Sequence, residues 1–180
     1  MVLNTKKRDI KSRLVPLLLS AGIILIDQVS KIVVIHAIPK GGAVPVIGNF
    51  FRLIHVQNPA IAFSIGHGLQ SGTRRPLFIL LPLVVIAVLF LYYIFTRDPL
   101  TRFQKWCFGA LVGGGLGNYV DRIFRPDGVV DFLDFRFYGI LGMERWPTFN
   151  LADATVVVAG ILLFISFLIP SRKQSAGDPT

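Results

Sequence analysis

Long apolar runs dominate the pattern of hydrophobic and polar positions along the chain. The clearest is 76–95, twenty consecutive residues without a charge, which at about 1.5 Å per residue cover about 30 Å of hydrocarbon. A second run follows Asp153 and ends before Pro170. Two less pure runs carry polar residues near one end. The pattern predicts four membrane-spanning helices, at residues 14–36, 76–95, 106–123 and 150–169.

Two of the segments between these helices show a different pattern. Residues 43–57 are rich in β-branched and aromatic side chains and contain the turn signal Gly48-Asn49, which predicts a short hairpin. Residues 129–137 are expected to add another strand. We therefore expect a single all-α membrane domain, residues 1–180, with a small β-rich platform formed by the outer segments 37–75 and 124–149.

Composition supports the membrane class, because 53% of the residues are hydrophobic and only 16% are charged. A net charge of +9 also suggests nucleic-acid binding. The Lys and Arg residues, however, lie at the ends of apolar runs, where they meet anionic lipid headgroups. We expect membrane lipids as partners and no nucleic acid. A cleaved signal peptide is an alternative for the first run, but no cleavage site precedes a soluble sequence, which favours a retained helix.

The distribution of positive charge predicts the orientation. The tails and the loop between the second and third helices (1–13, 170–180, 96–105) hold ten Lys or Arg in 34 residues, whereas the two outer segments hold seven in 65. Cytoplasmic segments are enriched in Lys and Arg. Both termini are therefore expected in the cytoplasm and the β-rich platform on the extracytoplasmic side.

Several polar residues lie within or beside the spans, where each ionisable group costs about 2.5–3.5 kcal/mol at the bilayer centre. Asp27 and Lys31 are four residues apart, so they share a helix face and can form a helix-stabilising pair. Asn118, Asp121 and Arg122 form a polar stripe at the end of the third span. Snorkelling of Arg122 is the simpler interpretation of that residue.

Two aspartates suggest chemistry. Asn150 and Asp153 begin the fourth span, where capping alone can explain both residues. Asp131 lies between apolar neighbours with no capping role, and its most economical partner is Asp153. Two adjacent carboxylates share a proton, so one can activate water while the other donates a proton to the leaving amine. We therefore predict peptide hydrolysis of the aspartic-protease type, with Asp131 and Asp153 catalytic.

Other hydrolytic chemistries fit the sequence less well. The histidines lack zinc-binding spacing, so we expect no metal site; they are His36, His55 and His67. A serine–lysine dyad using Lys31 is disfavoured, because Asp27 would oppose the depressed pKa that a lysine base needs.

Two alternatives come from other functional classes. A small transporter or ion-translocating subunit would use an ion relay, through Asp27, Lys31, Asp121 and Asp153, but we find no internal repeat of the kind such proteins carry. A membrane scaffold would pack through glycines repeated every fourth residue from Gly109. It leaves Asp131 unexplained.

Five sequence blocks resemble the lipoprotein signal peptidases, the type II signal peptidases of bacteria. In chain order they are DQVSK (27–31), NPAIAFS (58–64), GGGLGNYVDR (113–122), VVDF (129–132) and FNLADA (149–154). The second block departs from the usual family pattern NTGAAFS at Pro59, Ala60 and Ile61. The missing glycine removes backbone freedom beside the expected site.

The resemblance implies an activity, a location and residue roles. The activity is hydrolysis just before a diacylglyceryl-modified cysteine, which removes the signal peptide from a prolipoprotein without a metal or cofactor. The location is the bacterial cytoplasmic (inner) membrane, in a multi-pass protein with its active site toward the extracytoplasmic face. Asp131 and Asp153 match the catalytic pair. The positions that match substrate-lining or supporting residues are Asn58, Asn118, Arg122 and Asn150, and those with structural or orienting roles are Asp27, Lys31 and Asp121.

Overall fold

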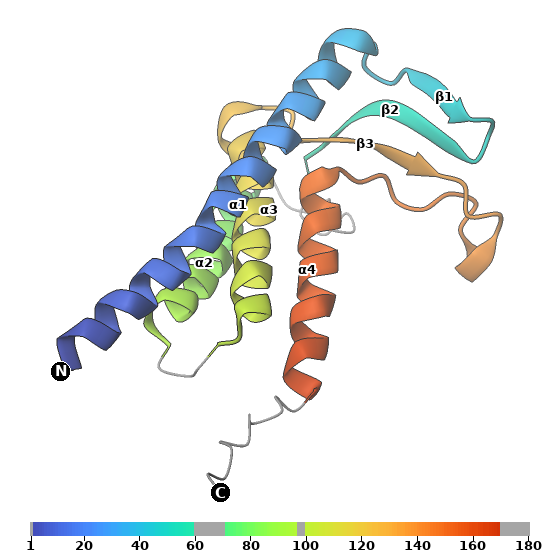
Figure 1. Cartoon of the computed structure of the whole chain (residues 1–180). Coiled ribbons are helices and arrows are strands. Elements are labelled where there is room, and N and C mark those ends of the chain that lie inside the picture. The colour runs from blue at the N-terminus through green and yellow to red at the C-terminus, as the bar shows by residue number, and fades with distance from the viewer. Residues whose placement is uncertain (1, 60–70, 97–99, 170–180) are drawn as a thin grey trace, which may run out of the picture.

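The structure is a computed structural model that describes residues 2–59, 71–96 and 100–169. It is mostly helical with one small antiparallel sheet, as predicted (Figure 1). The elements are α1 (Val2–Ala37), β1 (Ala43–Ile47), β2 (Phe51–Asn58), α2 (Ser71–Phe95), α3 (Arg102–Phe124), β3 (Val129–Phe135), the 3-10 turn η2 (Ile140–Gly142) and α4 (Leu151–Leu168).

Three helices begin earlier than the apolar pattern indicated, and one of them is α2, which starts at Ser71 rather than at residue 76. α1 starts at Val2 rather than at residue 14, since no glycine or proline interrupts the chain before Pro16 and the helix continues through that residue. α3 starts at Arg102 rather than at residue 106, because the side chains of Thr101 and Gln104 form a reciprocal capping box. Hydrophobicity marks the apolar part of a helix, whereas capping marks its end.

The described helices differ in how well they could span a membrane. Ser12–Ala37 and Leu151–Leu168 are long and apolar enough to cross one, while the apolar described part of α2, Ile79–Phe95, is shorter. α3 is less hydrophobic than α2 or α4. Length and apolarity thus support two spans directly.

α3 is the central helix, and three consecutive glycines explain why. A Cβ on Gly113 would lie 2.8 Å from the Cα of Ser20 in α1, and one on Gly115 would lie 2.9 Å from a side-chain carbon of Ile86 in α2. A Cβ on Gly114 would meet the backbone of α4 at 2.7 Å. Each glycine therefore admits a different helix to close contact with α3.

A buried arginine joins α1 to the end of α2. Arg13 donates from Nη1 to the carbonyl oxygen of Ile94 at 3.0 Å and from Nη2 to that of Thr96 at 2.9 Å. The hydroxyl of Tyr93 donates back to the carbonyl of Arg13 at 2.6 Å. The last carbonyls of a helix lack partners within it and attract positive charge. Arg13, predicted as part of a basic tail, is instead a C-terminal cap for α2.

The sheet has the strand order β1-β2-β3 and lies at the end of the helical bundle away from the first turn of α1 (Figure 1). The predicted hairpin is confirmed, and Gly48 adopts a positive φ of 47° in its turn. The expected third strand is present as β3, which ends at Phe135. Val130 and Phe132 of β3 pack against Val34 at the end of α1, which fixes the sheet beside the ends of the helices.

Candidate active site

Asn150 and Asp153 form a capping box at the start of α4. Asn150 Oδ1 accepts a hydrogen bond from the backbone N–H of Asp153 at 2.9 Å, and Asp153 Oδ2 accepts one from the backbone N–H of Asn150 at 3.2 Å. The capping interpretation is therefore correct for both residues. It accounts for only part of their contacts.

The same asparagine joins the two aspartates. Asn150 Nδ2 donates to Asp131 Oδ1 at 2.8 Å, while the capping box holds Asp153. Asn58 Nδ2 donates to the second oxygen of Asp131 at 3.1 Å. Asn118 Nδ2 donates to Asp153 Oδ1 at 2.7 Å. Two residues that are 22 positions apart in the sequence thus share one amide-lined site.

The environment of Asp131 favours its protonated form. The residue is 3% exposed, and burial, reinforced by the nearby charge of Asp153, raises the pKa of Asp131 to about 7. The hydrogen bonds from Asn58 and Asn150 and the charge of Lys31 act in the opposite direction. Asp131 can therefore carry a proton up to neutral pH.

Lys31 is the centre of a fully buried ion network. Its Nζ lies 2.7 Å from Asp27 Oδ2 and 2.9 Å from Asp121 Oδ2, and all three side chains are inaccessible to solvent. It also donates to Asn118 Oδ1 at 3.0 Å. The interpretation of Asp27 and Lys31 as a helix-stabilising pair is therefore too narrow, because the pair joins α1 to α3.

The two carboxylates of this network also hold the backbone beside the candidate catalytic residues. Asp27 Oδ1 accepts from the N–H of Ala152, one residue before Asp153. Asp121 Oδ2 accepts from the N–H of Val130, one residue before Asp131. The network therefore sets the positions of the start of α4 and of β3, which is consistent with an orienting role for Asp27, Lys31 and Asp121.

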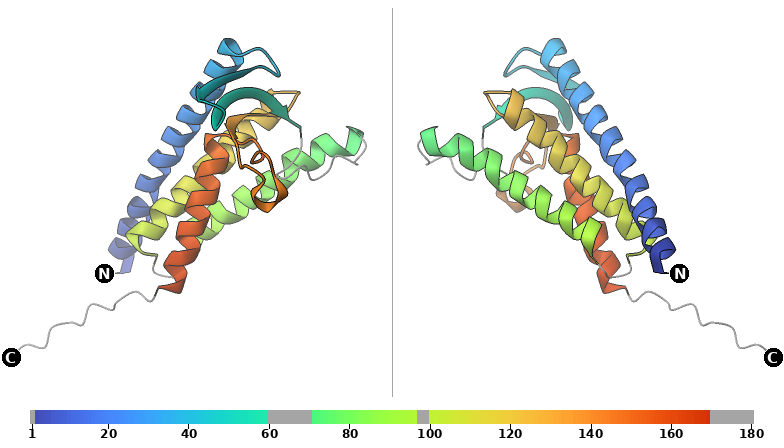
Figure 2. Two further views of the ribbon diagram at one scale, coloured as in Figure 1. Left: turned by 90° about the vertical axis from the view of Figure 1, so that its right-hand side faces the viewer. Right: turned by 90° about the vertical axis from the view of Figure 1, so that its left-hand side faces the viewer.

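The site lies on the side of α3 between α2 and α4. Gly114 faces α4 and Gly115 faces α2, and Asn118 and Arg122 follow Gly114 at one-turn intervals. In the described chain no Cα of α2 comes within 8 Å of one in α4, and the two helices diverge (Figure 2). Arg122 is partly buried, donates to the carbonyl of Asn118 at 3.1 Å, and lies within electrostatic range of both aspartates.

Comparison with known proteins places this arrangement in a family. The sequence model of the family described as Signal peptidase (SPase) II matches residues 19–169. This chain belongs to the signal peptidase II family. It is 39% identical over 171 residues to the lipoprotein signal peptidase of Treponema pallidum (strain Nichols), covering 94% of this chain and 91% of that protein. The corresponding protein of Treponema denticola is 43% identical over 164 residues, covering 91% and 94%.

Two solved structures of bacterial membrane enzymes share the fold of this chain. A bacterial membrane enzyme determined by the in meso method at 2.3 Å resolution superposes with a TM-score of 0.73, at 24% identity, and covers 92% of this chain and 94% of that one. A second, determined at 1.9 Å resolution, has a TM-score of 0.72 at 26% identity and covers 87% and 94%. Family membership favours the peptidase over the transporter and scaffold alternatives.

Two supporting residues were not predicted from the sequence. Gln28 Nε2 donates to Asp121 Oδ1 at 3.0 Å and to the carbonyl of Gly117 at 3.0 Å. Arg125 forms an ion pair with Asp121 and donates to Gln28 Oε1 at 3.1 Å. The available signals were the place of Gln28 beside Asp27 and the four-residue spacing from Asp121 to Arg125.

Some residues considered at the sequence level lie away from this site or outside the described residues. The Nδ1 atoms of His36 and His55 lie 2.8 and 2.9 Å from the carbonyl oxygens of Ile32 and Ile38. Within the described residues, no group of three or more His, Cys, Asp or Glu could hold a metal ion. Pro59 is described and exposed. The rest of the second block, with Ala60 and Ile61, and also His67, fall outside the described residues.

Proposed function

We propose that this protein is an aspartic endopeptidase that removes signal peptides from diacylglyceryl-modified bacterial prolipoproteins, cleaving just before the lipidated cysteine. Membership of the signal peptidase II family and relatives named lipoprotein signal peptidase support the activity. The observation that carries the residue assignment is the amide of Asn150, which bonds to Asp131 while its capping box holds Asp153.

In the proposed mechanism the two aspartates have different roles. Asp131 carries the shared proton, because its pKa is raised to about 7. Asp153 is the ionised partner, since Asn118 and the backbone of Asn150 donate to its oxygens and the charge of Arg122 interacts with it more strongly than with Asp131. Asp153 takes a proton from water as the water oxygen attacks the scissile carbonyl carbon. Asp131 then protonates the leaving amine as the C–N bond breaks.

The proposed setting is the bacterial cytoplasmic membrane, crossed four times by α1, α2, α3 and α4. Both termini lie in the cytoplasm, and the sheet and the aspartates face the extracytoplasmic side. The polar site lies beside the sheet at one end of the bundle, whereas Arg13 and the start of α3 lie at the other, which supports this arrangement. Membrane lipids surround the helices, and lipidated substrate enters laterally between α2 and α4, where Asn58 and Arg122 line the site.

A cleavage assay with purified, lipidated prolipoprotein in detergent micelles tests the proposal. Asp131→Asn and Asp153→Asn should each reduce turnover by about three orders of magnitude or more, since residues acting as a unit are lost together. Asp127→Asn is the matched control, because Asp127 is exposed and pairs only with exposed Lys40 among the described residues. Near-native turnover in either active-site variant would remove that aspartate from the mechanism.

A further inference from the structure

An apolar groove of about 570 Å³ runs between α1, α3 and α4. The lining residues that define it are Ile23, Ile26, Cys107, Ala110, Val158 and Leu162. Asp153 lies about half a turn around α4 from the groove-lining residues Leu151 and Val158. The groove therefore opens on the opposite side of the α3–α4 contact from the candidate active site.

A smaller cavity of about 370 Å³ adjoins the groove at the end of the bundle away from the sheet. Its lining residues are Ser12, Val15, Pro16, Arg102, Lys105 and Trp106. Trp106 also lines the apolar groove, so the two cavities adjoin at this residue. The combined surface is apolar along the helices and basic at its end.

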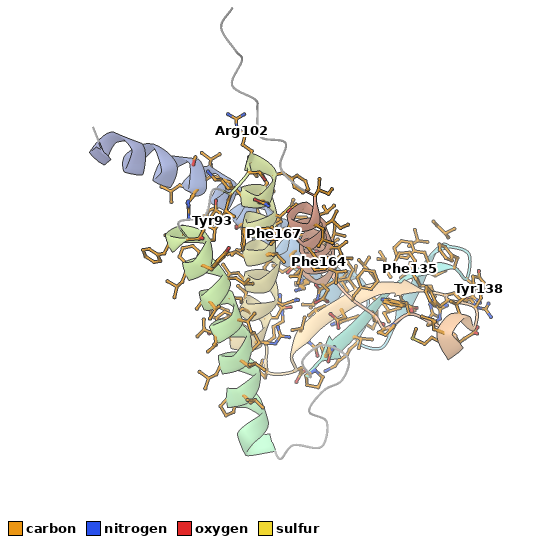
Figure 3. The ribbon with its side chains drawn as sticks, turned by 90° about the horizontal axis from the view of Figure 1, so that it is seen from below. Tyr93, Arg102, Phe135, Tyr138, Phe164 and Phe167 are labelled. Atoms are coloured by element: carbon orange, nitrogen blue, oxygen red, sulfur yellow. The ribbon has the colours of Figure 1, made fainter. Side chains whose placement is uncertain are left out.

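The two basic side chains at this end have different environments. Arg102 is exposed and points away from the bundle (Figure 3), and no carboxylate among the described residues lies within ion-pairing distance of it. Lys105 Nζ donates to Ser12 Oγ at 2.8 Å, which holds the ammonium over the smaller cavity. Both residues lie in the first turn of α3, where the helix dipole adds positive potential.

We propose that these two cavities form a binding site for an anionic phospholipid, separate from the substrate site. The phosphate headgroup contacts Arg102 and Lys105, the Trp106 ring lies at the headgroup level, and an acyl chain fills the apolar groove. Three features fit this occupant. The charge is complementary, tryptophan favours the membrane interface, and the groove volume lies within the range of about 300–1,000 Å³ typical of small-molecule sites. The inference rests on the membrane topology given under the proposed function.

The chain offers a direct probe, because it contains two tryptophans, Trp106 and Trp146. Trp146 lies beyond η2, near the sheet, where its ring packs at a tilted angle against that of Phe137. The protein is placed in nanodiscs of unlabelled zwitterionic lipid that contain an increasing fraction of one brominated lipid. The brominated lipid is either phosphatidylglycerol or phosphatidylcholine, and in both the bromine is on the acyl chains. In the Trp146→Phe variant, quenching then reports lipid contact at Trp106 alone. In the Trp106→Phe variant, quenching reports lipid contact at Trp146, at the other end of the molecule.

We expect brominated phosphatidylglycerol to quench Trp106 with about tenfold higher apparent affinity than brominated phosphatidylcholine, because each basic residue near the headgroup attracts an anionic lipid. Added salt should reduce this preference. Arg102→Gln combined with Lys105→Gln should abolish it, while the control Lys40→Gln, at an exposed ion pair, should not. Trp146 should show no preference.

Two outcomes would overturn the proposal. Equal quenching of Trp106 by both lipids would show contact with the bilayer without a headgroup site. Absence of quenching by either lipid would show that the groove is covered by protein, either a second copy or another membrane helix. Prolipoprotein cleavage by the same preparations is measured separately, so loss of the lipid preference with normal cleavage rejects this site alone. Absence of cleavage with the preference retained rejects the proposed function alone.

Discussion

Asn150 uses every polar atom of its side chain. Oδ1 caps α4, and Nδ2 lies within hydrogen-bonding distance of Asp131 Oδ1, Asn118 Oδ1 and the carbonyl of Val130, at 2.8, 3.0 and 3.3 Å. The residue is fully buried. A buried amide with every atom occupied is held in a single orientation. One side chain therefore begins a helix and also fixes the carboxylate of a neighbouring strand.

The raised pKa of Asp131 predicts the pH dependence of cleavage. The proposed acid is active when protonated, so kcat/KM should fall as pH rises through about 7, approaching a tenfold loss per pH unit. The hydrogen bond from Asn58 lowers this pKa. Asn58→Ala should therefore move the alkaline limb to higher pH, whatever its effect on the maximal rate. An unchanged limb in this variant would show that Asp131 does not control the profile.

The buried ion network predicts that replacing its lysine destabilises the protein much more than replacing an exposed, paired lysine does. Lys31→Met would leave the carboxylates of Asp27 and Asp121 without their shared cation in a solvent-free site. Breaking a buried pair in this way costs about 3–5 kcal/mol. Lys40→Met, which breaks the exposed pair with Asp127, should have little effect. Thermal unfolding in detergent compares the two variants, and similar melting temperatures would contradict the structural role of the network.

At the scale of elements, the molecule is organised around α3. Its glycines allow three other helices to approach, and its C-terminal end carries Asn118, Asp121 and Arg122 toward the site. Helix contact in a membrane depends on close packing rather than on hydrophobic driving force. Small residues on α3 therefore determine both the stability of the bundle and the position of the candidate active-site residues.

Two glycine substitutions test this packing. Gly113→Ala places a Cβ 2.8 Å from the backbone of Ser20, which must move, at a cost of about 1–3 kcal/mol. Gly22→Ala is the matched control, because its Cβ would meet nothing within 4 Å. Replacing a helical glycine there should leave stability unchanged or raise it slightly. Thermal unfolding that ranks Gly22→Ala below Gly113→Ala would contradict the close contact of α1 with α3.

At the scale of the whole molecule, polar and apolar surfaces are sharply separated. Large apolar side chains are exposed along the helices, including Leu18, Leu80 and Phe164, whereas the ion network around Lys31 is buried and bonds to the backbone of β3. A surface of this kind suits contact with lipid. We therefore expect a lipid-anchored substrate to reach the candidate site from the membrane more readily than a soluble peptide does.

Lipidation of the substrate should consequently control cleavage. Burial of acyl chains contributes about 0.8 kcal/mol per CH₂, so an unlipidated precursor should show a much lower kcat/KM with the same scissile bond. The measurement compares lipidated and unlipidated forms of one precursor in the same micelles. The Asp127→Asn variant should preserve the ratio, since Asp127 is exposed and pairs with the exposed Lys40. Equal rates for the two forms would contradict recognition through the acyl chains.

The sequence alone determined the local features of the protein. The β-branched and aromatic residues and the turn signal of 43–57 predicted the hairpin, and the spacing of Asp27 and Lys31 predicted their pairing, because both depend on neighbours a few residues apart. The five blocks were sufficient to indicate the family. The four spans remain a prediction, and the cleavage assay tests the catalytic roles of Asp131 and Asp153.

Tertiary structure decided which distant residues meet. Asp27 bonds to the backbone of Ala152 across 125 residues, and Arg13 caps α2 across about 80 residues. Neither contact can be predicted from the hydrophobic periodicity of the sequence. Both depend on how closely α1, α2 and α4 approach α3 at its glycines. The roles of Gln28 and Arg125 and the two adjoining cavities at Trp106 depend on the same packing. Local patterns specify helices and strands, whereas steric fit between them specifies which buried polar groups become partners.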